Sequence, residues 1–163
     1  MLIEPMDEYR FELARPRDAQ AIAALSRRLI EAGLPPAWPA ERVLCHINRT
    51  DSVVLAARLH GCLGGFAIMQ FGDDRAHLNL LAVDSAHQRR GLGRRLMVWL
   101  HESALVAGTF LLTLELRATN TTARCFYEAL GYRADGVMAG YYQGREDALR
   151  MSLDLRVGRS LTA

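Results

Sequence analysis

An arginine-rich segment that contains two glycines, residues 84–96, has the composition of an anion-binding loop. It lies between an apolar run at residues 78–83 and a stretch with the apolar spacing of a helix. The first N–H groups of a helix have no intrahelical acceptor, and the helix dipole adds a partial positive charge there. Gly91 and Gly93 carry no side chain that would keep an anion away from those groups. The surrounding positive charge comes from Arg89, Arg90, Arg94 and Arg95. The segment therefore predicts a phosphate or pyrophosphate site at a strand-to-helix turn.

The loop matches neither of the two best-known phosphate motifs. It lacks the Gly-Lys-Ser/Thr ending of a Walker loop, which also argues against a generic nucleotide-phosphate binder. No third glycine completes a dinucleotide fingerprint. A tight turn with a solvated arginine cluster stays open as a structural alternative. Residues 88–93, Gln-Arg-Arg-Gly-Leu-Gly, resemble the acetyl-CoA loop of the GNAT N-acetyltransferase superfamily, which reads Gln/Arg-x-x-Gly-x-Gly/Ala.

A second motif follows about thirty residues later, as the length of a βαβ unit requires. It resembles the GNAT segment Asn-x-x-Ala-x-x-x-Tyr-x-x-x-Gly-Phe/Tyr, and Asn120, Tyr127 and Gly131 match it without gaps. Residues 114–132 and 141–151 are most similar to the ribosomal-protein-alanine acetyltransferase branch of the superfamily. The resemblance covers residues 78–153 by motif and nearly the whole chain by element order.

The resemblance implies that acetyl-CoA is the acetyl donor and that no metal takes part. Backbone groups of residues 81–83 would contact the thioester and the pantetheine, and amides of residues 88–94 would hold the pyrophosphate. Asn120 would hydrogen-bond the pantetheine, although its position also suits a helix N-cap alone. The implied cofactor-binding residues are Leu81, Ala82, Val83, Gln88, Arg89, Arg90, Gly91, Leu92, Gly93, Arg94, Asn120 and Tyr127.

The same resemblance implies that Glu115 is the general base and Tyr127 the general acid. An acceptor amine is mostly ammonium at neutral pH and must lose a proton before it attacks, while the departing thiolate needs a proton or a hydrogen bond. Many GNAT members place a glutamate base where Asn79 stands here, so the role of proton acceptor would fall to Glu115 or to a water relay. Alternatively, Glu115 is a solvated residue on the polar face of a strand, and the Tyr127 ring only covers the core. His77 is expected to be a half-buried or surface histidine.

Composition restricts the expected partners and location. The 163 residues fit one domain, residues 1–163, with a frayed tail at 157–163. A net charge of +2 is too small to indicate nucleic acid binding, although all 20 basic residues are arginine. Because no apolar stretch approaches the roughly 20 residues of a membrane span, we expect no membrane partner and a cytoplasmic protein. The three cysteines share no metal-ligand spacing and are expected to be small buried residues.

Hydrophobic periodicity predicts a mixed α/β fold, which matches the GNAT fold in its element order. We expect one mixed, mostly antiparallel sheet with helices on both faces. The predicted strands are residues 9–13, 52–58, 62–71, 76–83, 110–116, 132–138 and 148–155, with a loop at 144–147. The predicted helices are residues 18–30, 40–47, 91–107 and 121–130.

The leading hypothesis is an N-acetyltransferase that moves an acetyl group from acetyl-CoA directly to a primary amine. No nucleophile motif calls for a covalent enzyme intermediate. The acceptor is either a protein N-terminal α-amine or a small molecule, because residues 31–50 carry no recognisable peptide-binding pattern. The alternative is a non-catalytic acyl-CoA-binding sensor or partner module. The protein is expected to be a monomer or a homodimer.

Overall fold

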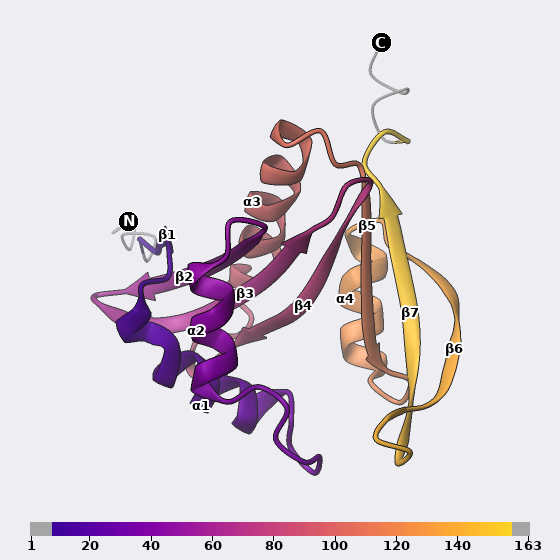
Figure 1. Ribbon diagram of the computed structural model, residues 1–163, viewed down its shortest axis with the longest axis horizontal. Helices are drawn as coiled ribbons and strands as arrows, with labels where there is room; N and C mark the ends of the chain where they lie inside the picture. Colours follow the sequence, from indigo (N-terminus) through magenta and orange to yellow (C-terminus); the bar gives the residue numbers. More distant parts are fainter. Residues whose placement is uncertain (1–7, 158–163) are drawn as a thin grey trace, which may run out of the picture. The chain divides into compact units, whose positions relative to one another are not determined.

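The computed structural model describes residues 8–157, within which the chain forms seven strands and four α-helices (Figure 1). In chain order these are β1 (Arg10–Leu13), α1 (Ala19–Leu29), α2 (Ala40–Asn48), β2 (Ser52–Leu59), β3 (Cys62–Phe71), β4 (Arg75–Val83), α3 (Leu92–Val106), β5 (Leu111–Arg117), α4 (Thr121–Ala129), β6 (Arg133–Tyr142) and β7 (Glu146–Asp154). Short 3-10 turns at Pro16–Asp18 and Ser85–His87 were not predicted.

The strands form a mixed sheet in the order β1-β2-β3-β4-β5-β7-β6. Strands β4 and β5 pair in parallel, from Arg75 opposite Leu111 to Leu78 opposite Leu114. The pairs β1–β2, β5–β7 and β6–β7 are antiparallel. The parallel pair is joined by α3, as a crossover between parallel strands requires. The predicted mixed, mostly antiparallel sheet is therefore confirmed.

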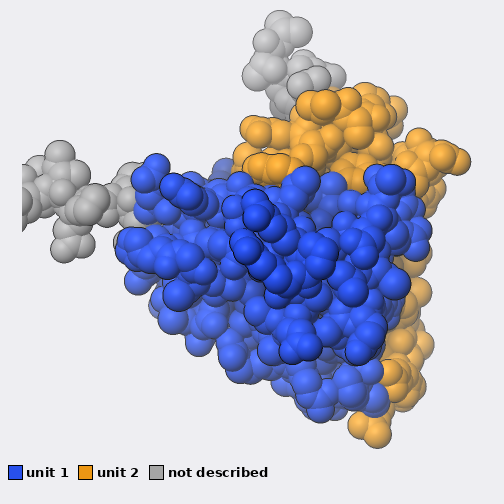
Figure 2. Space-filling view, turned by 60° about the vertical axis from the view of Figure 1, so that its left-hand side comes forward, with its two compact units in different colours: residues 1–68, 80–97 blue, residues 69–79, 98–163 orange. Residues whose placement is uncertain are grey.

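Two compact units divide the chain (Figure 2). Unit 1 contains residues 1–68 and 80–97, and unit 2 contains residues 69–79 and 98–163. The division passes through β3, β4 and α3, so each unit includes a part of these elements. That the chain is one domain stays a prediction.

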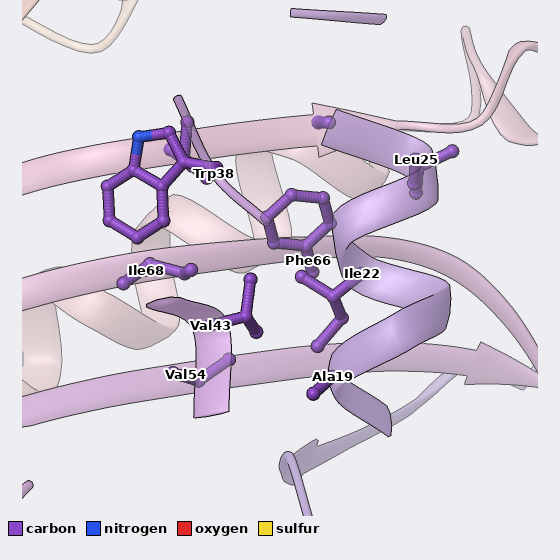
Figure 3. Packing of buried hydrophobic residues seen from close by; sticks show 10 residues of the cluster. Ala19, Ile22, Leu25, Trp38, Val43, Val54, Phe66 and Ile68 are labelled. Carbon is purple, nitrogen blue, oxygen red and sulfur yellow. The ribbon is translucent and has the colours of Figure 1, made fainter. Parts of the chain in front are cut away.

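The core of unit 1 lies between its two N-terminal helices and the strands they cover (Figure 3). Ile22 of α1, Val43 of α2 and Phe66 of β3 are fully buried there. Helical spacing brings the apolar side chains of each helix to one face, which packs on the sheet. Burial of each such side chain stabilises the fold by about 1.5–3 kcal/mol. Trp38, from the loop before α2, closes the same cluster.

A buried carboxylate fixes that loop. Glu31 is 6% exposed and accepts hydrogen bonds from the backbone N–H groups of Ala37 and Trp38, the latter at 2.9 Å. The guanidinium of Arg42 lies 4.0 Å from the centre of the Trp38 ring. Glu31 before the loop and Arg42 after it therefore both hold the loop in place, in addition to the stiffness that its prolines provide.

The side chains of β5, in unit 2, alternate between buried and less buried positions. Leu112, Leu114 and Leu116 are buried on one face, while Thr113 and Glu115 point to the other. Successive side chains of a strand point to opposite faces, so the alternation seen in the sequence predicted this arrangement. The antiparallel pairing with β7 sets Glu115 opposite Arg150.

The structure corrects two predictions. Cys45, Cys62 and Cys125 are all exposed free thiols, so the expectation of buried cysteines is wrong. The predicted loop at 144–147 is shorter, because β7 already begins at Glu146. The chain reverses tightly there, with left-handed φ angles of 54° at Gln143 and 73° at Gly144.

Some predictions concern absences or the ends of the chain. Within residues 8–157, no helix is long and apolar enough to cross a membrane, and no group of three His, Cys, Asp or Glu residues has the arrangement of a metal site. The predicted frayed tail lies outside the described residues, apart from residue 157.

Candidate active site

The glycine-rich loop of unit 1 has the backbone geometry of an anion cradle. Arg89 and Gly91 both have left-handed φ angles, 63° and 73°, immediately before α3 begins at Leu92. Such turns direct consecutive N–H groups toward one point, and non-glycine residues adopt them at a cost that is concentrated at functional sites. A Cβ built on Gly91 has no heavy atom within 4 Å, so the space beside the loop is open. A diphosphate fits this geometry and charge.

Contacts within unit 1 fix the shape of this loop. The Gln88 side-chain amide donates to the carbonyl oxygen of Val83 at 3.0 Å, which joins two of the predicted cofactor residues. Asp84 accepts a 2.8 Å bond from Arg28 of α1 and a 3.2 Å bond from the backbone N–H of Ala86. The Ala86 bond, followed by the Arg28 charge, lowers the pKa of Asp84. The loop is therefore held in one shape by its neighbours.

The C-terminal half of β4, which contains Leu81, Ala82 and Val83, depends on a glycine that the sequence analysis did not single out. A Cβ at Gly65 would lie 2.9 Å from the carbonyl oxygen of Ala82. Real side chains do not come so close to backbone, so only glycine lets β3 approach β4 at this point. The predicted thioester-binding backbone of β4 thus depends on Gly65.

In unit 2, Asn120 is the N-cap of α4. Its Oδ1 accepts a 3.0 Å hydrogen bond from the backbone N–H of Ala123. The predicted capping role is confirmed. One cap bond leaves the amide nitrogen and the second lone pair of Oδ1 available for the predicted contact with pantetheine.

Glu115 is neither solvated nor isolated. Its side chain is 8% exposed, and its two carboxylate oxygens have different partners. Oε2 lies 2.8 Å from Nε2 of His77 on β4. Oε1 accepts bonds from Nη2 and Nε of Arg150 on β7, at 3.0 and 3.2 Å. The alternative of a solvated surface glutamate is therefore wrong.

These contacts decide the ionisation of Glu115. Burial alone raises the pKa of its carboxyl, but the hydrogen bonds and charges of His77 and Arg150 outweigh burial and bring the pKa below its ordinary value. Donors that bind the charged form of an acid favour that form. Glu115 is therefore ionised at neutral pH and is a weak proton acceptor.

Tyr127, unlike Glu115, is buried among aromatic rings. Its side chain is 8% exposed, and its ring packs edge-on against Phe126 and Tyr132, with centroids 5.0 and 5.5 Å apart. Burial, and then the neighbouring Tyr142, raise the pKa of the Tyr127 phenol well above its ordinary value. The ring does cover the core, as one alternative proposed, and its hydroxyl remains protonated.

Three residues of this site were missed or underrated by the sequence analysis. His77 was expected only to be half-buried, and Arg150 was given no role. Tyr142 is near enough to Glu115 and Tyr127 to interact electrostatically with both, and burial first raises its own pKa to about 12. The polar face of β5 was the available clue. The sequence does not give the register that brings residues 77, 142 and 150 to it.

The comparisons with known proteins agree with this geometry. A family model described as acetyltransferase (GNAT) domain matches residues 49–134, more than half of the chain. The ribosomal protein bS18-alanine N-acetyltransferase of Escherichia coli K12 is 40% identical over 99 residues, which cover 59% of this chain and 67% of that protein. The chain belongs to the GNAT acetyltransferase family. A crystal structure of the Escherichia coli ribosomal-protein-S18-alanine N-acetyltransferase superposes on this GNAT chain with a TM-score of 0.80 and 30% identity, covering 91% of this chain and 94% of that one.

The donor follows from the family. A crystal structure of a streptothricin acetyltransferase of Bacillus anthracis in complex with acetyl coenzyme A is 25% identical, with a TM-score of 0.62, over 67% of this chain and 65% of that one. This GNAT protein is an acetyl-CoA-dependent N-acetyltransferase. The predicted family, fold, enzyme class and donor are thus confirmed.

Proposed function

We propose that this GNAT enzyme transfers the acetyl group of acetyl-CoA directly to the α-amino group of a protein N-terminus. The observation that carries the proposal is the 40% identity to a protein named for acetylation of an alanine of a ribosomal protein. The same similarity favours the cytoplasm as the place of action. Whether the enzyme is a monomer or a homodimer stays a prediction.

The ionisation of Glu115 favours an α-amine over a lysine side chain. An α-amino group has a pKa of about 7.7–8.0, whereas a lysine amine has a pKa of about 10.4. A carboxylate whose pKa is lowered by His77 and Arg150 is too weak a base to remove a proton efficiently from a lysine ammonium. An α-amine loses its proton far more readily, so this weak base suits it.

In the proposed mechanism, Glu115 receives the proton of the acceptor ammonium, directly or through one water molecule. Its negative charge also attracts the ammonium and favours binding of the amine. Oε2 keeps a lone pair in addition to the one that His77 uses, whereas Oε1 already accepts two bonds from Arg150. The neutral amine then attacks the acyl carbon of acetyl-CoA, and the C–S bond breaks as the C–N bond forms. The second proton of the nitrogen passes to the departing thiolate, so that CoA leaves as the thiol.

Tyr127 stabilises the leaving group in this mechanism. A thiol has a pKa of about 8.5, so full proton transfer from a phenol with a raised pKa is uphill. Tyr127 therefore donates a hydrogen bond to the sulfur as negative charge develops there. This role is electrostatic stabilisation and needs no deprotonated tyrosine.

The remaining predicted residues bind the donor. Amides of residues 88–94 and the charges of Arg89, Arg90 and Arg94 hold the diphosphate. Backbone groups of Leu81, Ala82 and Val83 and the side-chain amide of Asn120 bind the pantetheine arm and the thioester. The left-handed turn at Arg89 and Gly91 supports the first of these assignments.

The test uses two synthetic peptides of the same length. One has a free N-terminal alanine and no lysine, and the other has an acetylated N-terminus and one internal lysine. At pH 7.5 the neutral fraction of an α-amine exceeds that of a lysine by about 10²-fold. We expect kcat/KM, measured by CoA release and confirmed by mass spectrometry, to favour the free α-amine by at least that factor. Equal or faster acetylation of the lysine peptide would contradict the proposed acceptor.

A further inference from the structure

His77, on β4 in unit 2, holds one oxygen of Glu115 through a short side chain. The parallel register of β4 and β5 sets His77 directly opposite Thr113. The two ring nitrogens of His77 have separate partners: Nδ1 lies 2.8 Å from Oγ1 of Thr113, and Nε2 lies 2.8 Å from Oε2 of Glu115. A chain of polar contacts therefore runs from Thr113 through His77 to Glu115.

The chemistry of the partners fixes the tautomer of the neutral imidazole. An ionised carboxylate only accepts hydrogen bonds, so Nε2 of His77 carries the hydrogen that it donates to Glu115. Nδ1 must then accept, and the hydroxyl of Thr113 donates to it. If His77 gains a proton, Nδ1–H donates to Thr113 instead, and the bond from Nε2 to Glu115 is kept. The donor to Glu115 is present in both charge states of His77.

Arg150 cannot replace this contact. It binds the other oxygen, Oε1, through a long side chain that is 46% exposed. His77 has few rotatable bonds, is 33% exposed and is anchored at its far nitrogen. A separate donor residue on each oxygen fixes the plane of the carboxylate as well as its position.

We propose that His77, anchored by Thr113, is a positioning residue that keeps the Glu115 carboxylate correctly oriented to receive the proton of the acceptor amine. This inference rests on the proposed function, in which Glu115 is the base. It adds to Glu115 of β5 and Tyr127 of α4 a residue of β4, the strand on which Asn79 cannot accept a proton.

Other groups around Glu115 determine how much the loss of His77 can change the enzyme. Arg150 on β7 remains to hold the carboxylate in its charged form, and Tyr142 on β6 faces it. Arg117 of β5 and Glu146 of β7 form an ion pair at 3.5 Å beside Tyr142. Loss of His77 removes one of the two groups that lower the pKa of Glu115, so that pKa rises. The rate of a variant without His77 then falls relative to that of wild type as the pH is lowered.

The experiment compares His77→Leu with His77→Gln on the free-alanine peptide between pH 5 and 9. The glutamine amide nitrogen can replace Nε2 as the donor, whereas leucine has no donor. We expect His77→Leu to lower kcat about tenfold, a part of the 10²–10⁴-fold effect of a positioned base, and to lower it by a larger factor at pH 5 than at pH 8. The KM for acetyl-CoA stays unchanged. His77→Gln retains most of the wild-type kcat and the wild-type pH profile.

Two further variants separate this inference from the proposed function. Glu115→Gln tests the base itself, and adding His77→Leu to Glu115→Gln should slow the enzyme no further, because positioning acts through the carboxylate. If Glu115→Gln is slow but His77→Leu matches wild type in kcat and pH profile, the role of His77 is overturned and the proposed function stands. If Glu115→Gln matches wild type, the base assignment fails, and the inference fails with it.

Controls keep the test interpretable. His60→Asn removes an exposed histidine at the β2–β3 turn and should leave kcat unchanged. Thermal melting shows whether each variant is folded. Should His77→Leu not fold, Thr113→Val provides the same test, because it keeps the side-chain shape and removes the hydroxyl that anchors Nδ1. We expect a several-fold loss of kcat for Thr113→Val, and an unchanged kcat would contradict the inference.

Discussion

The two proposed catalytic side chains have opposite and stable protonation states across the neutral pH range. Glu115 is ionised because two donors hold its oxygens, and Tyr127 is protonated because its phenol is buried. Neither group titrates near pH 7, so the pH dependence of the rate near neutrality should come from the acceptor amine. These two fixed protonation states fit a direct transfer, in which the enzyme stabilises the charges of the transition state and forms no covalent intermediate.

Tyr127→Phe removes the hydroxyl that is proposed to stabilise the thiolate. We expect kcat to fall by about 10²-fold, within the range of lost hydrogen-bond donors to developing charge, with little change in the KM for acetyl-CoA. Steady-state kinetics with the free-alanine peptide measure both quantities.

Tyr132→Phe is the matched control, because Tyr132 is also buried and its ring contacts Tyr127. Its hydroxyl is bonded to His101 at 3.0 Å, so its loss should lower stability by about 1 kcal/mol and leave kcat nearly unchanged. A kcat loss in Tyr132→Phe equal to that in Tyr127→Phe would mean that ring packing, and not the hydroxyl, sets the rate.

The motif at residues 114–131 was sufficient to select Glu115 and Tyr127 from the sequence. It did not reveal their partners. His77 and Arg150 lie 38 and 35 positions away in the chain, and they reach Glu115 only through strand pairing. Register depends on turn geometry and on packing across the whole sheet, so a local pattern does not determine it.

Strand and helix boundaries could be predicted where local chemistry fixes them. The apolar spacing and glycines around α3 placed its start within one residue of Leu92. The left-handed turn at Arg89 was not predicted, because non-glycine residues seldom adopt it. The sequence predicted a strand that ends at residue 138, whereas β6 continues to Tyr142. The turn that ends β6 was not predicted, because Gln143 is another non-glycine residue with a positive φ.

The start of α3 can be tested with a pair of matched glycines. Gly91 at its N-terminus and Gly108 beyond its C-terminus have φ angles of 73° and 76°, and neither would bring a Cβ within 4 Å of another heavy atom. An alanine at either position should destabilise the fold by about 1–2 kcal/mol through backbone strain. Only Gly91→Ala should also weaken acetyl-CoA binding, by about tenfold in Kd as measured by isothermal titration calorimetry.

The two variants together separate an effect on stability from an effect on acetyl-CoA binding. Their shared loss of stability measures the left-handed strain, and the difference in Kd measures the role of the loop in binding. If Gly108→Ala weakens acetyl-CoA binding as much as Gly91→Ala does, the effect is one of general stability, and the diphosphate site must be sought elsewhere.

For the chain as a whole, periodicity and element order were enough to give the fold class, because a βαβ unit requires the parallel pair and short turns favour antiparallel neighbours. The exposure of Cys45, Cys62 and Cys125 was not predicted, since it depends on which face of each element packs inward. Cys125 lies on α4 two residues before the buried Tyr127, about 200° around the helix, and so on the opposite side. Apolar composition alone does not determine that face.

Acid sensitivity of folding follows from histidines that are buried in a neutral state. Burial lowers the pKa of His101 to about 4, while an unfolded histidine titrates near 6.5. Between these values the unfolded chain binds a proton that the folded chain does not, so stability falls as the pH drops from about 6.5 to about 4. The largest contribution of His101 is about 3 kcal/mol.

His101→Gln should remove most of this dependence. Glutamine can still hydrogen-bond the Tyr132 hydroxyl but does not titrate, so the free energy of unfolding should change less between pH 7 and 4.5 than in wild type. Urea denaturation at a series of pH values measures it. Burial also lowers the pKa of His46, so a double variant with His46→Gln should be flatter still. Carboxylates with lowered pKa, such as Asp154 at about 2, lose their stabilising contribution mainly below pH 4.5. An unchanged slope in His101→Gln would show that the loss of stability above pH 4.5 has another source.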